Sequence, residues 1–261
     1  THCISSAASD VYKRQTYDKI DKLMEFINPI EFKLMIDEYH NFLKQYSFRD
    51  KAINGVLAHF KEFKSYCFLS ATPIPNNLKP AIFNDITEYM ADWNTTDEIT
   101  VYPYHTNTPY MVAAKFIKTY QAKGCLNVNG IESKEAYFFI NSVTEIKAIL
   151  KQTQLTEDDY RIICADNPKN RKTLEGYTIS SSADAPKKFN FITSKSFEGV
   201  DFHSETGLCF VVSNVQNRHT LVSIDMDIPQ IVGRIRTKSN PFRNKVVHIF
   251  NTCLLYTSPS P

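Results

Sequence analysis

Short apolar runs alternate with amphipathic segments along most of this chain, and this alternation limits the fold more than any other feature. Between Met111 and Phe250 the apolar runs have the length of buried strands, and the intervening segments show helical spacing. The expected strands are 136–140, 161–164, 189–193, 208–212 and 246–250, and the expected helices are 111–120, 143–150 and 228–235. Strands that alternate with helices favour a parallel sheet covered on both faces. The sequence therefore predicts an α/β fold.

The region before residue 100 repeats this alternation on a smaller scale. Helical spacing over 17–27 and 51–63 is interleaved with apolar runs at 32–36 and 66–69, which we expect to be buried parallel strands. A mixed polar stretch follows, and a junction is expected before Pro103 or Pro109. We therefore expect two parallel-sheet domains, 16–103 and 104–252, the first of them truncated at its amino-terminal side.

The two ends of the chain do not resemble protein sequence. Residues 5–15 resemble a translated transposase adapter, and residues 253–261 resemble the opposite adapter read outward. Segments of this kind are excluded from fold reasoning, so we expect 1–15 and 253–261 to be sequencing artefacts. On this interpretation 16–252 is a fragment of a longer gene product.

Composition excludes several classes of protein. With 30 Lys and Arg against 28 Asp and Glu, the net charge is only +2, so any contact with nucleic acid must be local. Cys67, Cys125, Cys164 and Cys209 are too scattered for a zinc site or a disulfide framework, which favours buried thiols in a reducing, cytoplasmic setting. No apolar run approaches the length of a membrane span, so no membrane partner is expected.

Two polar strings follow the first pair of expected strands. Asp37 and Glu38 end one strand, and the carboxyl ends of parallel strands are where α/β sheets bind ligands. An Asp there can hold Mg²⁺ through water, and a neighbouring Glu can orient an attacking water. His40 comes two residues later, and Ser70 and Thr72 end the next strand. The alternatives are an ordinary acidic strand end and an ordinary turn before a proline.

Two further polar strings follow later strands. Thr193 and Ser194 end one strand and precede Gly199 and Asp201, a pattern that also suits a plain strand and turn. In the string from 230 to 236, Gln230 and Arg234 are four residues apart and share one face of the expected helix, and a second arginine, Arg236, follows. The planar guanidinium of arginine can donate two hydrogen bonds to phosphate oxygens. The alternative to a phosphate-binding string is a solvated basic helix end.

Taken together, these strings resemble the ordered motifs of superfamily two helicases of the DExH type. Residues 37–40 are similar to motif II, 70–72 to motif III, 136–142 to motif IV, 193–201 to motif V and 230–236 to motif VI. The resemblance implies two RecA-like domains with ATP and Mg²⁺ in the cleft between them and nucleic acid across both. The DExH signature and the 230–236 string are more similar to DNA-processing than to RNA helicases.

The resemblance also assigns a role to each matching residue. The implied residues are, for catalysis, Asp37 (which would hold Mg²⁺), Glu38, His40, Gln230, Arg234 and Arg236; for coupling, Ser70 and Thr72; for the nucleotide, Gly199, Asp201 and Gly233; and for nucleic acid, Asn141, Ser142, Thr193 and Ser194. The family usually places its second arginine three residues after the first, where this chain has Thr237. The sequence therefore leaves open which arginine approaches the phosphates.

One essential part of such a motor has no counterpart in the sequence. The phosphate-binding loop has the form Gly-x-x-x-x-Gly-Lys-Ser/Thr, and none of the seven glycines is followed by lysine. We therefore expect the loop to have been lost upstream, and the chain alone neither to bind ATP tightly nor to hydrolyse it. Two alternatives stay open: the motor subunit of a restriction system, and a non-catalytic nucleic-acid-binding module with a helicase fold.

Overall fold

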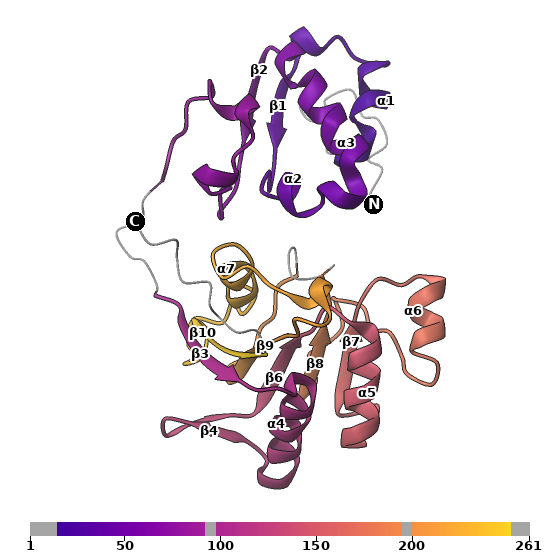
Figure 1. The fold of residues 1–261 in the computed structure, drawn as a ribbon, viewed down its shortest axis with the longest axis vertical. Helices are drawn as coiled ribbons and strands as arrows, with labels where there is room; N and C mark the ends of the chain where they lie inside the picture. Colours follow the sequence, from indigo (N-terminus) through magenta and orange to yellow (C-terminus); the bar gives the residue numbers. More distant parts are fainter. Residues whose placement is uncertain (1–14, 92–97, 195–199, 252–261) are drawn as a thin grey trace. The chain divides into compact units, whose positions relative to one another are not determined.

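The computed structural model describes residues 15–91, 98–194 and 200–251, which form two compact units. The first unit extends to Glu88 and the second begins at Tyr89 (Figure 1). This division precedes the expected one after residue 103, because strand β3 (Thr100–His105) pairs within the sheet of the second unit. Most of the polar stretch before it belongs to neither sheet.

The first unit contains one parallel pair of strands and several short helices. Strand β1 (Lys33–Ile36) pairs in parallel with β2 (Ser65–Phe68), as the two apolar runs predicted. The helical elements are η1 (Tyr17–Lys19), α1 (Ile20–Met24), η2 (Pro29–Glu31), α2 (Asn41–Lys44), α3 (Tyr46–His59), η3 (Phe60–Glu62), η4 (Asn76–Leu78) and η5 (Ala81–Phe83).

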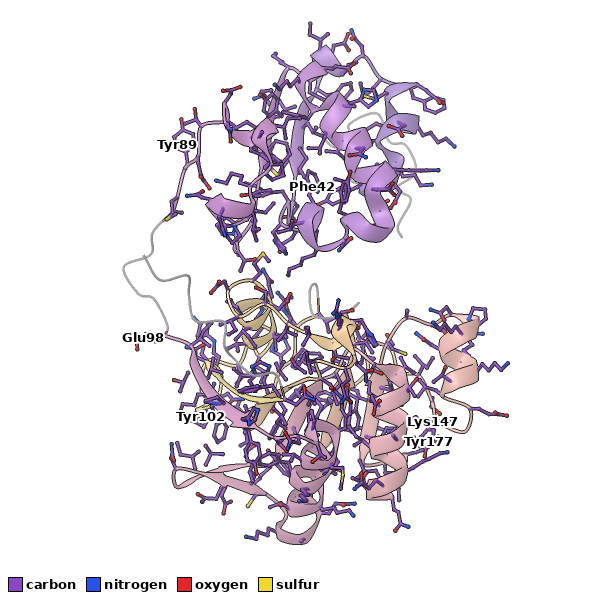
Figure 2. The ribbon with its side chains drawn as sticks, in the orientation of Figure 1. Phe42, Tyr89, Glu98, Tyr102, Lys147 and Tyr177 are labelled. Carbon is purple, nitrogen blue, oxygen red and sulfur yellow. The ribbon has the colours of Figure 1, made fainter. Side chains whose placement is uncertain are left out.

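The described residues pack against one face of this two-stranded sheet. Ile36 is 3% exposed and belongs to a core that includes Phe42, whose ring lies 6.2 Å from the ring of Phe68 (Figure 2). Met35 points the other way and is 67% exposed, and Cys67 is exposed as well. The prediction of strands buried on both faces is therefore wrong for this unit, as is the prediction of a buried thiol at Cys67.

Helices α1 and α3 approach each other closely at one glycine. A Cβ placed on Gly55 would lie 2.6 Å from an oxygen of Asp21 and 2.9 Å from Ile20. Real side-chain carbons do not come so near, so a larger residue would push α1 away from α3. This contact holds the beginning of the described chain against α3.

The second unit is built on a six-stranded sheet in which every neighbouring pair is parallel. The order across the sheet is β3, β10 (Lys245–Phe250), β9 (Gly207–Ser213), β6 (Glu135–Phe139), β8 (Phe189–Ile192) and β7 (Tyr160–Ile163). The prediction of an α/β fold with parallel sheets is confirmed in both units.

Helices cover both faces of this sheet (Figure 1). On one face α4 (Pro109–Lys123) and α5 (Val143–Thr153) pack over a core that contains Phe138 and Phe210, and α6 (Pro168–Thr173) lies beside α5. On the other face α7 (Asp227–Val232) packs over Tyr137 and Phe139. The short helix η7 (Arg218–Thr220) precedes α7. Alternate residues of β6 therefore enter opposite cores, as expected for a strand buried on both faces.

Three strands were not expected from the sequence. Strand β3 contains Pro103, which is tolerated because β3 is an edge strand. Strands β4 (Leu126–Val128) and β5 (Ile131–Ser133) form an antiparallel hairpin. Its turn is Asn129-Gly130, with φ angles of 52° and 86°, the left-handed pair that a tight two-residue hairpin requires.

Candidate functional site

The segments that follow β1 and β2 are joined by backbone hydrogen bonds. Leu69 donates to the carbonyl of Ile36 at 2.8 Å, and Tyr39 donates to the carbonyl of Leu69 at 3.1 Å. Between these contacts Glu38 has a left-handed backbone, with φ of 52°. This conformation is uncommon outside glycine and costs of order 1–3 kcal/mol. It turns the chain immediately after β1, where Asp37 and Glu38, two of the residues predicted to act in catalysis, lie.

His40 is the centre of a polar cluster in the first unit. Its ring is fully buried, and Nδ1 lies 2.8 Å from the Ser70 hydroxyl and 3.2 Å from a Glu38 carboxylate oxygen. The Thr72 hydroxyl lies 3.5 Å from the same nitrogen, while the Thr72 amide donates to Ser70 Oγ at 3.0 Å. Three residues from two separate sequence strings, Glu38, Ser70 and Thr72, therefore meet around the His40 imidazole.

Asp37 stands apart from this cluster. Its residue is exposed at the carboxyl end of β1, and its backbone carbonyl accepts a hydrogen bond from the Tyr17 hydroxyl. Within the described ranges no group of three or more His, Cys, Asp or Glu side chains converges on a point where an ion could bind. A single exposed carboxylate fits Mg²⁺ held through water, which is how this reluctantly dehydrated ion often binds.

A second polar cluster lies at the carboxyl ends of β6 and β8, which are neighbours in the sheet. The Asn141 side-chain oxygen accepts from the Ser194 hydroxyl at 2.6 Å and from the Ser194 amide at 3.2 Å. The Asn141 amide group donates to the carbonyl of His219 at 2.6 Å. Two residues of the predicted nucleic-acid set, 53 positions apart in sequence, are thus in direct contact.

The other residues of that set have scaffold contacts. Ser142 is the N-cap of α5, and its hydroxyl accepts a hydrogen bond from the Glu145 amide at 3.4 Å, as serine side chains commonly do at helix starts. Thr193 is buried, and its amide donates to the carbonyl of Ile163 in the neighbouring strand β7 at 3.0 Å. Gly199 lies outside the described residues.

A third cluster joins Asp201 to the segment that follows α7. The Arg236 guanidinium lies 2.8 Å from an Asp201 carboxylate oxygen, and the Arg234 guanidinium lies 3.8 Å from the same oxygen. Arg234 also donates to the backbone carbonyl and the side-chain oxygen of Gln230, at 2.8 and 3.0 Å. These four residues come together, but the two arginines are not equivalent. The Arg234 side chain is 10% exposed and that of Arg236 is 50% exposed.

The helix that carries this cluster is shorter than expected. Helix α7 ends at Val232, so Arg234 lies in the turn after it and not on the helix itself. The i,i+4 contact with Gln230 survives because the turn continues the helical path. A Cβ on Gly233 would lie 3.2 Å from the Pro229 carbonyl, so the close approach there is to the preceding turn of its own helix.

Phe202 supports this cluster and was missed in the sequence. Its amide donates to the Arg234 carbonyl at 2.7 Å, and its carbonyl accepts from the Arg236 amide at 2.9 Å. Its ring is 2% exposed and lies 5.0 Å from that of Tyr137 and 5.3 Å from the Arg161 guanidinium. A single aromatic residue after Asp201 carries no motif, so sequence reasoning had no signal for this role.

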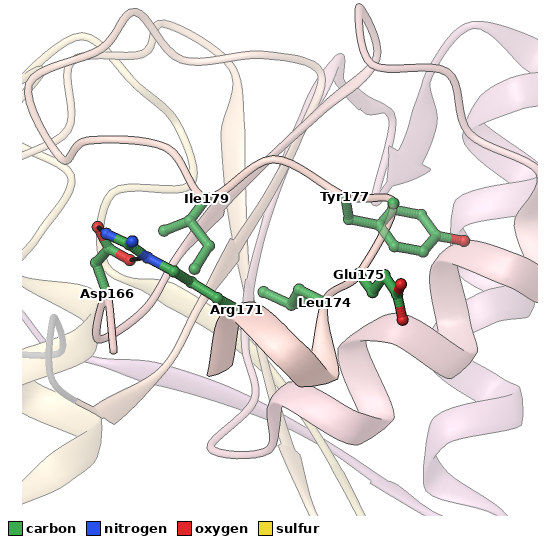
Figure 3. Close-up of a pocket in the computed structure, with 7 residues that line it drawn as sticks. Asp166, Arg171, Leu174, Glu175, Tyr177 and Ile179 are labelled. Carbon is green, nitrogen blue, oxygen red and sulfur yellow. Dashed lines mark hydrogen bonds and ion pairs between the residues drawn. The ribbon is translucent and has the colours of Figure 1, made fainter. Parts of the chain in front are cut away.

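A cavity of about 350 Å³ lies beside α6 in the second unit, and neither of the two clusters of that unit contributes a residue to its lining. Figure 3 shows Arg171 directed toward Asp166, whose carboxylate it binds at 2.5 and 2.7 Å. Leu174, Tyr177 and Ile179 supply apolar walls. None of the residues predicted from the sequence lines this cavity, and both partners of its ion pair are exposed.

Among the described residues no helix is long and apolar enough to cross a membrane. No protein-family model and no curated protein matches the sequence. Among solved structures the chain is similar to a hypothetical ATP-dependent RNA helicase from Sulfolobus tokodaii, at 13% sequence identity and a TM-score of 0.39. The similarity covers 89% of this chain and 63% of that one. A likeness this distant carries no argument, so the case for function depends on the clusters described above.

Proposed function

We propose that this chain forms the motor region of an ATP-dependent helicase or translocase of superfamily two that acts on DNA. The observation that carries the proposal is the 2.8 Å hydrogen bond between His40 and Ser70. It joins the string after β1 to the string after β2. The parallel pairing of these strands brings both strings to one edge of the sheet, and the specific observation is the contact between an imidazole and a hydroxyl there. A coupled motor needs such a contact, because hydrolysis must be communicated to other parts of the domain.

The carboxylates at the end of β1 would act on the nucleotide. Bound Mg²⁺ would offset the charge on the phosphates, with Asp37 holding it through water. Glu38, which is 35% exposed at its side chain, can accept a proton from an attacking water while its other contacts go to His40. The buried imidazole fixes the position of Glu38 and passes any movement of that carboxylate to Ser70 and Thr72.

The second unit would supply cationic and hydroxyl groups. Asp201 holds the Arg236 guanidinium at one edge, and the remaining N–H groups of that guanidinium can donate to a phosphate oxygen. At the carboxyl ends of β6 and β8, Asn141 and Ser194 present amide and hydroxyl groups of the kind that contact a nucleic-acid backbone. The DNA preference rests on the sequence resemblance alone.

The proposal includes inactivity of this chain in isolation. No glycine is followed by lysine, so the described carboxylates have no phosphate-binding loop to work with. The purified chain should show no Mg²⁺-dependent ATP hydrolysis above a blank, with or without single-stranded DNA. Turnover by the chain alone would contradict this part of the proposal.

The motor assignment is tested in any longer protein that contains this chain together with a Gly-x-x-x-x-Gly-Lys-Ser/Thr loop. ATP hydrolysis there should be stimulated by DNA, and Glu38→Gln should lower kcat by at least 100-fold, since general-base catalysis contributes about 10²–10⁴. Glu25→Gln, an exposed glutamate outside the cluster, is the matched control. Equal activity of the two variants would reject the catalytic role of Glu38, and no ATP hydrolysis by the unsubstituted protein would favour a non-catalytic binding module.

A further inference from the structure

A second cavity lies at the opposite end of the sheet from the predicted nucleic-acid residues. It measures about 320 Å³, and its walls include Thr100 and Lys245, the first residues of β3 and β10. These two residues are register partners in the sheet. The strands are about 17 Å long, so the cavity is separated by that distance from the carboxyl ends of the strands.

Positive charge predominates around this cavity. Lys238, Arg243 and Lys245 line it, and Glu98 is the single acidic residue in its wall. Glu205 lies beside it, where its carboxylate accepts from the Ser239 hydroxyl at 2.5 Å. Across the described ranges, no carboxylate lies within 4 Å of the ammonium groups of Lys238 and Lys245. Among the residues that the structure describes, these two lysine charges therefore have no carboxylate partner.

The loop that carries these cations is held in place by its own hydrogen bonds. The Asn240 side chain donates to the carbonyls of Ser204 and Gly207 at 2.8 and 3.0 Å and accepts from the Phe242 amide at 2.7 Å. Asn240 is 4% exposed, and Phe242 is fully buried. The Lys245 ammonium lies 5.8 Å from the centre of the Phe242 ring. The cations are thus presented by a fixed loop, which lowers the ordering cost of binding an anion.

We propose that this cavity binds phosphate groups of a nucleic-acid strand, as a contact separate from Asn141 and Ser194. Ammonium groups act as point charges for phosphate and an arginine adds a fork, while the side chains of Thr100 and Asn244 offer neutral donors. The choice of nucleic acid rests on the proposed function, whereas the affinity of the cavity for phosphate does not.

The test measures binding of a labelled single-stranded oligothymidine to the full chain by fluorescence anisotropy at several salt concentrations. The variant Lys238→Gln/Lys245→Gln should bind more weakly, and its plot of log K against log salt should be shallower by about 1.4, because each lost phosphate contact on a single strand contributes about 0.7. The control is Lys115→Gln/Lys151→Gln, which removes equal charge from exposed positions on α4 and α5. Far-UV circular dichroism confirms that both variants are folded.

Two results would overturn the proposal. If the two double variants bind the oligonucleotide with the same affinity and the same salt slope, the cavity is not a nucleic-acid site. If oligonucleotide binding is unchanged but calorimetric binding of pyrophosphate is lost in Lys238→Gln/Lys245→Gln, the ligand is a free polyphosphate. Asn141→Ala reports on the proposed function separately: weaker binding in that variant alone refutes the cavity and leaves the proposed function standing.

Discussion

The arginines that follow α7 differ in burial, so their substitutions should differ in cost. Arg234 is largely buried and donates twice to Gln230, whereas Arg236 is half exposed and has one close ion pair with Asp201. We expect Arg234→Gln to lower the free energy of unfolding by about 1.5–3 kcal/mol, the usual value of hydrogen bonds from a charged group. Arg236→Gln should cost less than about 1 kcal/mol, as exposed pairs do.

Urea denaturation followed by far-UV circular dichroism measures both values. Arg218→Gln, on η7 and outside the cluster, serves as the control. On this reasoning we expect Arg234 to be a scaffold residue and Arg236 to be the guanidinium that meets a phosphate. Equal losses of stability in the two variants would contradict that distinction.

His248 should make the protein less stable in mild acid. Burial lowers the pKa of this histidine from 6.5 to about 4, and its Nε2 lies 3.0 Å from the Ser213 hydroxyl. Between those two values the unfolded chain takes up the proton and the folded chain does not, so stability falls as pH decreases from 6.5 toward 4. The full loss is about 3 kcal/mol, at 1.36 kcal/mol for each pKa unit.

The check is chemical denaturation at pH 7 and at pH 4.5. Other groups also titrate in this range, so the informative quantity is the difference between the wild type and His248→Gln, which keeps a hydrogen-bonding partner for Ser213. The wild type should lose more stability than the variant on acidification. Identical losses would show that His248 is protonated freely in the folded state.

At the scale of elements, Arg161 on β7 contacts β8, the loop that contains Asp184, and Phe202 on one face of the sheet. It is 2% exposed, its Nε donates to the Asn190 side-chain oxygen at 2.6 Å, and a terminal nitrogen donates to the Asp184 carbonyl. Burial is the largest influence on the pKa of this arginine and lowers it. Its guanidinium also lies over Phe202, which is bonded to the backbone of both Arg234 and Arg236.

Arg161→Met keeps an unbranched apolar side chain in place of the aliphatic part of arginine and removes its donors. We expect a loss of about 1.5–3 kcal/mol in the free energy of unfolding, because hydrogen bonds from a buried charged group are lost. Hydrogen exchange should also become faster at the amides of Phe202 and Arg236, which depend on the same packing. Lys172→Met, a cation on α6, is the control. A destabilised variant with unchanged exchange at these two amides would remove the link to the arginine cluster.

The strands of the second unit were predictable because they are buried on both faces. Strands β6, β8 and β9 are short, continuous apolar runs, and such runs indicate fully buried strands. Strand β3 was missed because it carries Pro103 and alternates with polar residues at an edge. The hairpin of β4 and β5 left a usable signal, the Asn129-Gly130 pair, which sequence reasoning did not take up.

The contacts of the candidate site could be predicted from the sequence only in part. Strand ends bring Asn141 to Ser194 and His40 to Ser70 because parallel strands share one edge for their carboxyl ends. The unequal exposure of Arg234 and Arg236 could not be predicted, since it depends on where α7 ends. The basic cavity also has no linear signature, because its walls come from the starts of two strands and the loop before one of them.

At the scale of the whole molecule, the two units should differ in stability. Among the described residues, the second has a six-stranded sheet with helices on both faces, whereas the first has a two-stranded sheet packed on one face, with Met35 and Cys67 exposed on the other. Small sheets bury little apolar surface, and domains that fold separately can unfold separately. We expect the amides of β1 and β2 to exchange with solvent well before those of β6 and β9.

Hydrogen exchange measured by mass spectrometry on the full chain tests this order directly. In moderate urea, peptides from 33–68 should reach full exchange in one cooperative step while peptides from 135–139 and 207–213 stay protected. Gly55→Ala offers an internal control: its Cβ would collide with Asp21 and Ile20, so it should accelerate exchange in the first unit and leave the six-stranded sheet unchanged. Simultaneous loss of protection in both units, with Gly55→Ala affecting both equally, would show that the chain unfolds as a single cooperative body.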